Sequence, residues 1–172
     1  MALVSELMKL INATSVVMAN HPTLQVYLRR ELEWEFSQGP VDLRHVRSLV
    51  SSPRLMSLGV RAFSHPSLFE AGDTFLDLRT MLADYPQKTM AISFTNYRTL
   101  VDSAAVVDEY HPHDASVMKL QIWPFEPGDL SDFAMAVAVA LSYTPAELMA
   151  ESRISAAIGE LVGRWGFFTD EF

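Results

Sequence analysis

Apolar residues recur every three or four positions in the N-terminal part of the chain. This spacing predicts amphipathic helices over residues 2–19 and 22–37, each with one apolar and one polar face. His21-Pro22 separates the two helices, because a residue before proline avoids helical backbone angles and proline suits the first position of a new helix. Gly39-Pro40 is predicted to end the second helix.

Weaker helix signals continue to residue 86. Residues 41–50 indicate a short helix, and Ser52-Pro53 indicates the start of another, with Ser as the N-cap and Pro in the first turn. Ser67 and Glu70 have the spacing of a capping box, which predicts a further helix that ends at Tyr85-Pro86. The first half of the chain is therefore expected to be helical.

The middle of the chain has the pattern of strands. Residues 89–94 are partly β-branched or aromatic, and residues 115–123 alternate between apolar and polar side chains. A predicted helix over residues 97–110 separates them, so the segment has the length of a β-α-β unit with parallel strands. Two strands alone make a poor sheet, so we leave open a third strand within a segment that otherwise indicates a helix.

The last third of the chain predicts two more helices. Residues 129–143 are apolar on nearly all sides, which is typical of a buried helix. Thr144-Pro145 with Glu147 is the strongest helix-start signal in the chain, and the final helix is predicted from Pro145 to about Trp165. We therefore predict a mainly α fold with a small β component (α+β). It should have six to eight helices around the buried hydrophobic helix 129–143, with a C-terminal antiparallel helix pair.

Length and composition narrow the class of protein. The chain of 172 residues suits one compact domain, residues 1–172. It has no cysteine, which excludes disulfide scaffolds, zinc ribbons and thiol catalysis. No apolar run reaches the roughly 18 residues that span a bilayer, and no signal peptide is recognisable. We therefore expect a cytoplasmic protein without membrane contact.

Charge is distributed unevenly along the chain. The formal net charge of −8 at pH 7 disfavours general binding of nucleic acid, because phosphate repels an acidic protein. Residues 1–64 hold seven basic and five acidic side chains, a net charge of +2. Residues 65–172 hold six basic and sixteen acidic side chains, a net charge of −10. This polarity predicts a charge-polarised surface that contacts a protein partner.

Arginines stand out in residues 43–69, a stretch that contains no acid. On one continuous helix its four arginines would lie within about 100° of arc. Arginine is enriched at protein interfaces, so these are the predicted partner-binding residues: Arg44, Arg47, Arg54 and Arg61. Two alternatives stay open, namely pairing with the protein's own acidic residues and a local nucleic-acid contact near residues 44–61.

Residues 108–114 hold the densest group of candidate metal ligands. His111, His113 and Asp114 could coordinate zinc, manganese or iron if a loop brought them together. Ser116 stands where the His-x-His-x-Asp-His motif of metallo-β-lactamase-type hydrolases has its last histidine, and a solvated polar loop explains the same residues. Glycine-rich phosphate loops and a nucleophile elbow are absent from the sequence, so no catalytic residue or cofactor is predicted.

These patterns lead to three functional hypotheses. The leading one is a non-enzymatic soluble binding protein, such as an inhibitor, an immunity-type factor or an adaptor, that acts on a protein partner; a homo-oligomer is compatible with it. The alternative is a metal-dependent hydrolase centred on His111 and His113. The second alternative is an acidic mimic that blocks a nucleic-acid-binding machine.

Overall fold

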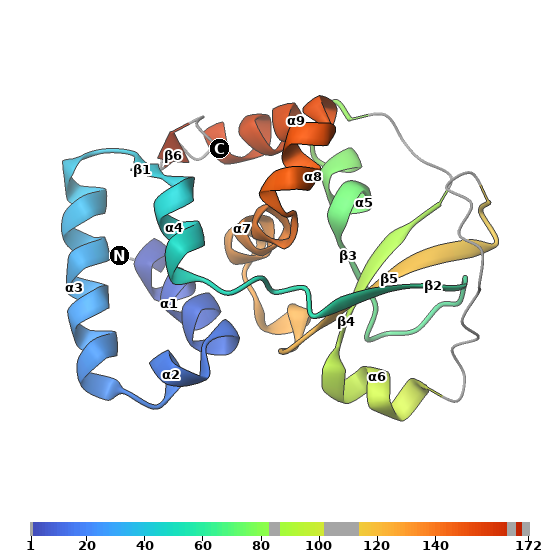
Figure 1. Ribbon diagram of the computed structural model, residues 1–172, viewed down its shortest axis with the longest axis horizontal. Coiled ribbons are helices and arrows are strands. Elements are labelled where there is room, and N and C mark those ends of the chain that lie inside the picture. Colours follow the sequence, from blue (N-terminus) through green and yellow to red (C-terminus); the bar gives the residue numbers. More distant parts are fainter. Residues whose placement is uncertain (1, 83–86, 102–113, 165–167, 170–172) are drawn as a thin grey trace. The chain divides into compact units, whose positions relative to one another are not determined.

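The computed structural model describes residues 2–82, 87–101, 114–164 and 168–169 (Figure 1). These residues form helices together with a four-stranded sheet, so the fold is mixed α/β. The chain divides into two compact units, residues 1–53 with 130–172 (unit 1) and residues 54–129 (unit 2). The expectation of one compact domain stays a prediction.

The N-terminal helices of unit 1 match the predicted ones, with one division. Residues 2–19 form α1 (Ala2–Thr14) and α2 (Val16–Ala19), and α3 (Pro22–Gln38) starts at the predicted proline. The division falls at Ser15, whose hydroxyl accepts a hydrogen bond from the amide of Met18 at 3.3 Å and so caps α2. Helix α1 buries its apolar face, including Leu7 and Ile11.

Short elements connect the N-terminal helices to unit 2. The strand β1 (Val41–Asp42) pairs in parallel with β6 (Phe168–Thr169). Helix α4 (Leu43–Leu49) begins at the carboxylate of Asp42, which accepts a hydrogen bond from the amide of Arg44 at 2.8 Å. Leu43 and Val46 bury the inner face of α4.

The C-terminal part of unit 1 contains α7 (Asp132–Ser142), α8 (Pro145–Ala150) and α9 (Ser152–Gly163). All side chains from residue 134 to 142 are buried, and Ser131 caps α7. The predicted capping box of Thr144 and Glu147 is present. The expected final helix is divided at Glu151, where the hydroxyl of Ser155 donates to the carbonyl of Leu148 at 2.7 Å. The arrangement of helices around α7 and the C-terminal antiparallel pair stay predictions.

Unit 2 contains the sheet in the order β2-β5-β4-β3 (Figure 1). The strand β4 (Thr89–Ser93) runs parallel to β5 (Val117–Trp123), as the β-α-β pattern predicts. Helix α6 (Phe94–Leu100) follows β4 and is capped by Ser93. The rest of the predicted helix 97–110 lies largely outside the described residues.

One predicted helix of unit 2 is wrong, and another begins later than predicted. The segment after Ser52-Pro53 forms the strand β2 (Met56–Arg61), which pairs antiparallel with β5 along its whole length. The predicted helix start at Ser67 is instead followed by β3 (Phe69–Glu70) and then α5 (Gly72–Asp77). Strand pairing with segments distant in sequence overrides the local helix-start signals in both places.

The number of helices in the described residues exceeds the expected six to eight. The described residues form nine α-helices, because two expected helices are divided and one becomes β2. None of the described helices is both long and apolar enough to cross a lipid bilayer.

The sheet of unit 2 is buried on both faces along its central strand. On one face Val60, Ile92 and Leu120 belong to an apolar cluster that Leu68 and Tyr97 partly cover. The other face buries polar groups, and the indole nitrogen of Trp123 donates to the side-chain carbonyl of Gln121 at 3.2 Å. Because β5 lies between β2 and β4, both of its hydrogen-bonding edges are paired, whereas β2 is paired along one edge among the described strands.

Candidate binding surface

Two of the four predicted partner-binding arginines lie on α4 and are engaged within unit 1. Arg44 donates from Nε and Nη2 to the carboxylate of Asp42 at 2.8 and 2.6 Å. These hydrogen bonds hold the pKa of Asp42 below its usual value. Arg47 is half-buried and donates to the carbonyls of Tyr143 at 2.7 Å and Ala140 at 3.3 Å. Burial lowers the pKa of Arg47, and its guanidinium satisfies carbonyls at the end of α7.

The other two arginines lie at the two ends of β2. Arg54 is half-buried and comes shortly before the strand, and Arg61 is its last residue and is exposed. The four arginines therefore do not form a stripe on one helix. Among the described residues, no carboxylate forms an ion pair with Arg61.

The strand β2 is the outermost strand on its side of the described sheet. Leu55 and Met56, where the strand begins, are 57% and 48% exposed. Sequence reasoning missed this edge because Ser52-Pro53 indicated a helix. The signal that could have found it is the alternation Met-Ser-Leu-Gly-Val-Arg over residues 56–61, which has the period of two that is typical of a strand.

The charge polarity along the sequence does not coincide with the two units. Counted over their residues, unit 1 and unit 2 each carry a net charge of −4. The predicted charge-polarised surface is therefore not a basic unit opposed to an acidic one. What remains is a local feature, the stretch of residues 43–69 that contains no acid.

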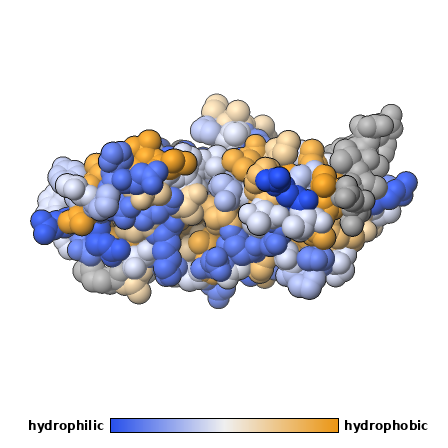
Figure 2. All heavy atoms as spheres, turned by 90° about the horizontal axis from the view of Figure 1, so that it is seen from below, coloured by the Kyte–Doolittle hydropathy of each residue, from blue (hydrophilic) through white to orange (hydrophobic). Residues whose placement is uncertain are grey.

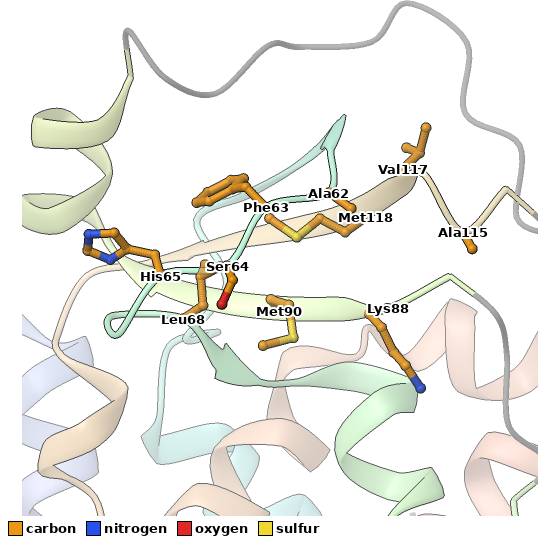
Figure 3. A pocket seen from close by; sticks show the side chains of 10 residues that line it. All are labelled: Ala62, Phe63, Ser64, His65, Leu68, Lys88, Met90, Ala115, Val117 and Met118. Atoms are coloured by element: carbon orange, nitrogen blue, oxygen red, sulfur yellow. The ribbon is translucent and has the colours of Figure 1, made fainter.

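A cavity of about 260 Å³ lies beside the segment that follows β2. Figure 3 shows Met90, Met118 and Phe63 along it, whereas the His65 ring and the Lys88 ammonium point away from these three side chains. The Nδ1 atom of His65 accepts a hydrogen bond from the amide of Ser67 at 3.1 Å. The cavity is smaller than the roughly 300–1,000 Å³ of typical small-molecule sites, and its lining is mainly apolar.

A second exposed apolar surface lies on α2 and α3 in unit 1. Trp34 and Tyr27 are 65% and 59% exposed, and Val17 is also exposed. A hollow of about 540 Å³ opens there, lined by Val17, His21, Pro22, Thr23, Leu24 and Tyr27. In Figure 2 apolar side chains form separate patches among hydrophilic ones, and one patch lies at the left, on the side of these helices. The sequence pattern did not single out this surface.

The predicted metal site cannot be assembled from the described residues. His111 and His113 lie outside them. Asp114 is exposed, and its Oδ1 atom accepts hydrogen bonds from the amide of Ser116 at 2.9 Å and its hydroxyl at 2.6 Å. In the part of the chain that the structure describes, no three His, Asp or Glu side chains are grouped to hold a metal ion. The hydrolase and acidic-mimic hypotheses stay predictions.

Comparison with models of protein families, with curated proteins and with solved structures finds no match for this chain. The function is therefore argued from the arrangement of its own residues.

Proposed function

We propose that this protein is a non-enzymatic binding protein, of the inhibitor, immunity or adaptor type, and that its contact with a protein partner includes the outer edge of β2. The observation that carries the proposal is an edge strand with exposed Leu55 and Met56 at its beginning and exposed Arg61 at its end. Exposed apolar side chains and an exposed arginine on one edge strand supply the two components typical of an interface, desolvated contact and a charge-assisted hydrogen bond.

The four arginines then have different roles. Arg61 binds a carboxylate of the partner, and Arg54 lies near the opposite end of the same strand. Arg44 and Arg47 stabilise unit 1 through Asp42 and the carbonyls at the end of α7. An acidic partner fits this stretch, because residues 43–69 contain no acid that would repel it.

Site-specific photo-crosslinking in the native cells tests the proposal. A benzophenone amino acid replaces Leu55 in one variant and Met149 in a control variant, since Met149 is an exposed apolar side chain on α8. We expect a discrete crosslinked product at position 55 and none at position 149. Adding Arg61→Glu should weaken that product at least fivefold, whereas the matched charge reversal Arg98→Glu on exposed α6 should leave it unchanged.

Two outcomes would overturn the proposal. One is the absence of any crosslinked product from the position-55 variant that keeps Arg61. The other concerns a third variant, which carries the benzophenone amino acid in place of Trp34 on α3. A crosslinked product from this variant alone would place the contact on the surface of α2 and α3 instead. The side chains replaced at positions 55 and 149 are exposed, so both variants should fold. Circular dichroism checks that they do.

A further inference from the structure

Among the described residues, one row of backbone hydrogen-bonding groups along β2 has no partner. Ala62 donates its amide to the carbonyl of Ser116 at 2.8 Å, and the register of β2 with β5 continues through this pair. In an antiparallel ladder every second residue points its N–H and C=O toward the neighbouring strand. Residues 56, 58 and 60 therefore face β5, and Ser57, Gly59 and Arg61 direct their N–H and C=O away from it.

No described residue forms a further backbone hydrogen bond with Ser57, Gly59 or Arg61. Natural proteins protect such an edge with charged residues, proline, a bulge or a covering element. Residues 56–60 of β2 contain no charged residue and no proline, and the strand's charged residue, Arg61, is its last. An edge of this kind pairs readily with another extended segment, which gains main-chain hydrogen bonds on binding.

The side chains along β2 define the pattern that an added strand needs. Met56, Leu58 and Val60 lie on the face of the apolar cluster, so the added strand extends that cluster with apolar side chains at alternate positions. The opposite face carries Arg61 on β2 and Lys119 on β5, which is paired with Gly59. These two cations are diagonal neighbours across the strand pair, and carboxylates on the added strand complement them.

A second copy of the chain fits this edge less well. Pairing of β2 with its own copy offers Arg61 no nearby carboxylate, because residues 43–69 of each copy hold four arginines and no acid. Like charges placed close together across two strands are destabilising. The charge of the edge therefore favours an acidic partner over self-association.

We propose that the outer edge of β2 receives an extended, acidic segment of the partner protein, which joins the sheet as an additional strand. This inference rests on the proposed function and specifies how the partner is recognised. Main-chain hydrogen bonds to Ser57, Gly59 and Arg61 hold the segment, and its carboxylates contact Arg61 and Lys119.

Synthetic peptides test the mode of recognition with the purified full chain. The probe is the capped peptide Val-Glu-Val-Thr-Val-Glu-Val, which alternates apolar and acidic or polar residues, and its counterpart carries Lys in place of Glu. Binding is followed by NMR of the protein's amides. We expect the amides of Ser57, Gly59 and Arg61 to shift with saturation, with at least tenfold weaker binding of the lysine peptide. Arg61→Glu should reverse this preference.

N-methylated peptides separate strand addition from contact between side chains alone. Methyl groups on alternate residues block either the amides that face β2 or those that face away. One methylated set should therefore abolish binding and the other should leave it unchanged; in antiparallel pairing the sensitive set is the Glu and Thr residues. Equal binding of both methylated peptides, or no saturable shift up to millimolar concentration, would overturn strand addition.

A proline variant checks the same point on the protein. Ser57→Pro removes one outward N–H and no bond to β5, as edge strands tolerate, and Ser57→Ala is the matched control. We expect Ser57→Pro to bind the acidic peptide at least tenfold more weakly than Ser57→Ala does. Self-association that Ser57→Pro abolishes, seen by sedimentation velocity, would identify a second copy as the occupant and overturn the acidic segment.

These results are distinguishable from failure of the proposed function. Crosslinking at position 55 that depends on Arg61 but is insensitive to Ser57→Pro keeps the protein-binding function and removes strand addition. Absence of both peptide binding and crosslinking at position 55 would overturn the proposed function together with strand addition.

Discussion

The half-buried Arg47 offers a direct test of whether an arginine of the acid-free stretch stabilises the fold or binds a partner. Its guanidinium donates to two carbonyls at the end of α7, at 2.7 and 3.3 Å. Replacing it with methionine keeps the aliphatic part of the side chain and removes both donors. The carbonyls of Tyr143 and Ala140 then lose a charged partner.

The expected cost follows from these two bonds. A hydrogen bond to a charged group contributes roughly 1.5–3 kcal/mol when buried. Because Arg47 is half-buried and one bond is long, we expect Arg47→Met to lower the free energy of unfolding by about 2 kcal/mol. For an m-value of roughly 2 kcal/mol/M, the urea midpoint should fall by about 1 M. Arg47→Lys should be intermediate, because an ammonium lacks the planar fork.

Arg44→Ala is the matched control on the same helix. The Arg44 side chain is 54% exposed and its ion pair with Asp42 lies at the surface, so its loss should cost less than about 1 kcal/mol. Urea unfolding followed by circular dichroism measures both variants, and the crosslinking assay at position 55 measures their partner contact. An Arg47→Met variant with unchanged stability and reduced crosslinking would refute the reasoning, since Arg47 would then act at the interface.

Three further predictions concern local features. Gly72→Ala should destabilise the protein by about 2–4 kcal/mol in urea unfolding, because Gly72 has φ +50° and an added Cβ would lie 2.8 Å from Cγ2 of Thr89; an unchanged midpoint would contradict it. Thr144→Ala should cost about 1 kcal/mol by the same assay through loss of the capping box, and a cost near zero would show that α8 does not depend on it. The hydrogen bond from Lys9 holds the pKa of Glu6 below its usual 4.5, so its stabilisation is present at neutral pH and is lost as the pH falls through that lowered value. The stability difference between wild type and Glu6→Gln should therefore narrow from pH 7 to pH 3, and a difference that is constant with pH would contradict this.

Local signals predicted much of unit 1. The start of α3 at Pro22 and the start of α8 at Thr144 depend on residues within one helical turn, so they can be predicted without knowledge of the fold. The parallel pair β4 and β5 was also predicted, because a helix between two strands imposes a crossover. The divisions at Ser15 and Glu151 were missed, since the apolar spacing continues through both.

The candidate site was predicted less well. The sequence singled out Arg54 and Arg61 by the lack of acids around them, but it could not show that they lie near the two ends of one strand. The α2 and α3 surface with Trp34 was not anticipated, because exposure of an aromatic side chain depends on which helix face finds a partner.

The sequence by itself determined the elements that depend on neighbouring residues: helix starts, caps, and the alternation of strands. It also determined the absence of acid around the four arginines. Only the tertiary structure decided that residues 56–61 form a strand at the edge of a sheet, because their partner β5 lies some sixty residues further along the chain. Pairing over that distance depends on the register of two strands and on the core they share. The same pairing decided that Arg61 lies on the outermost strand of the described sheet, whereas Arg47 donates to the carbonyls of Ala140 and Tyr143 at the end of α7.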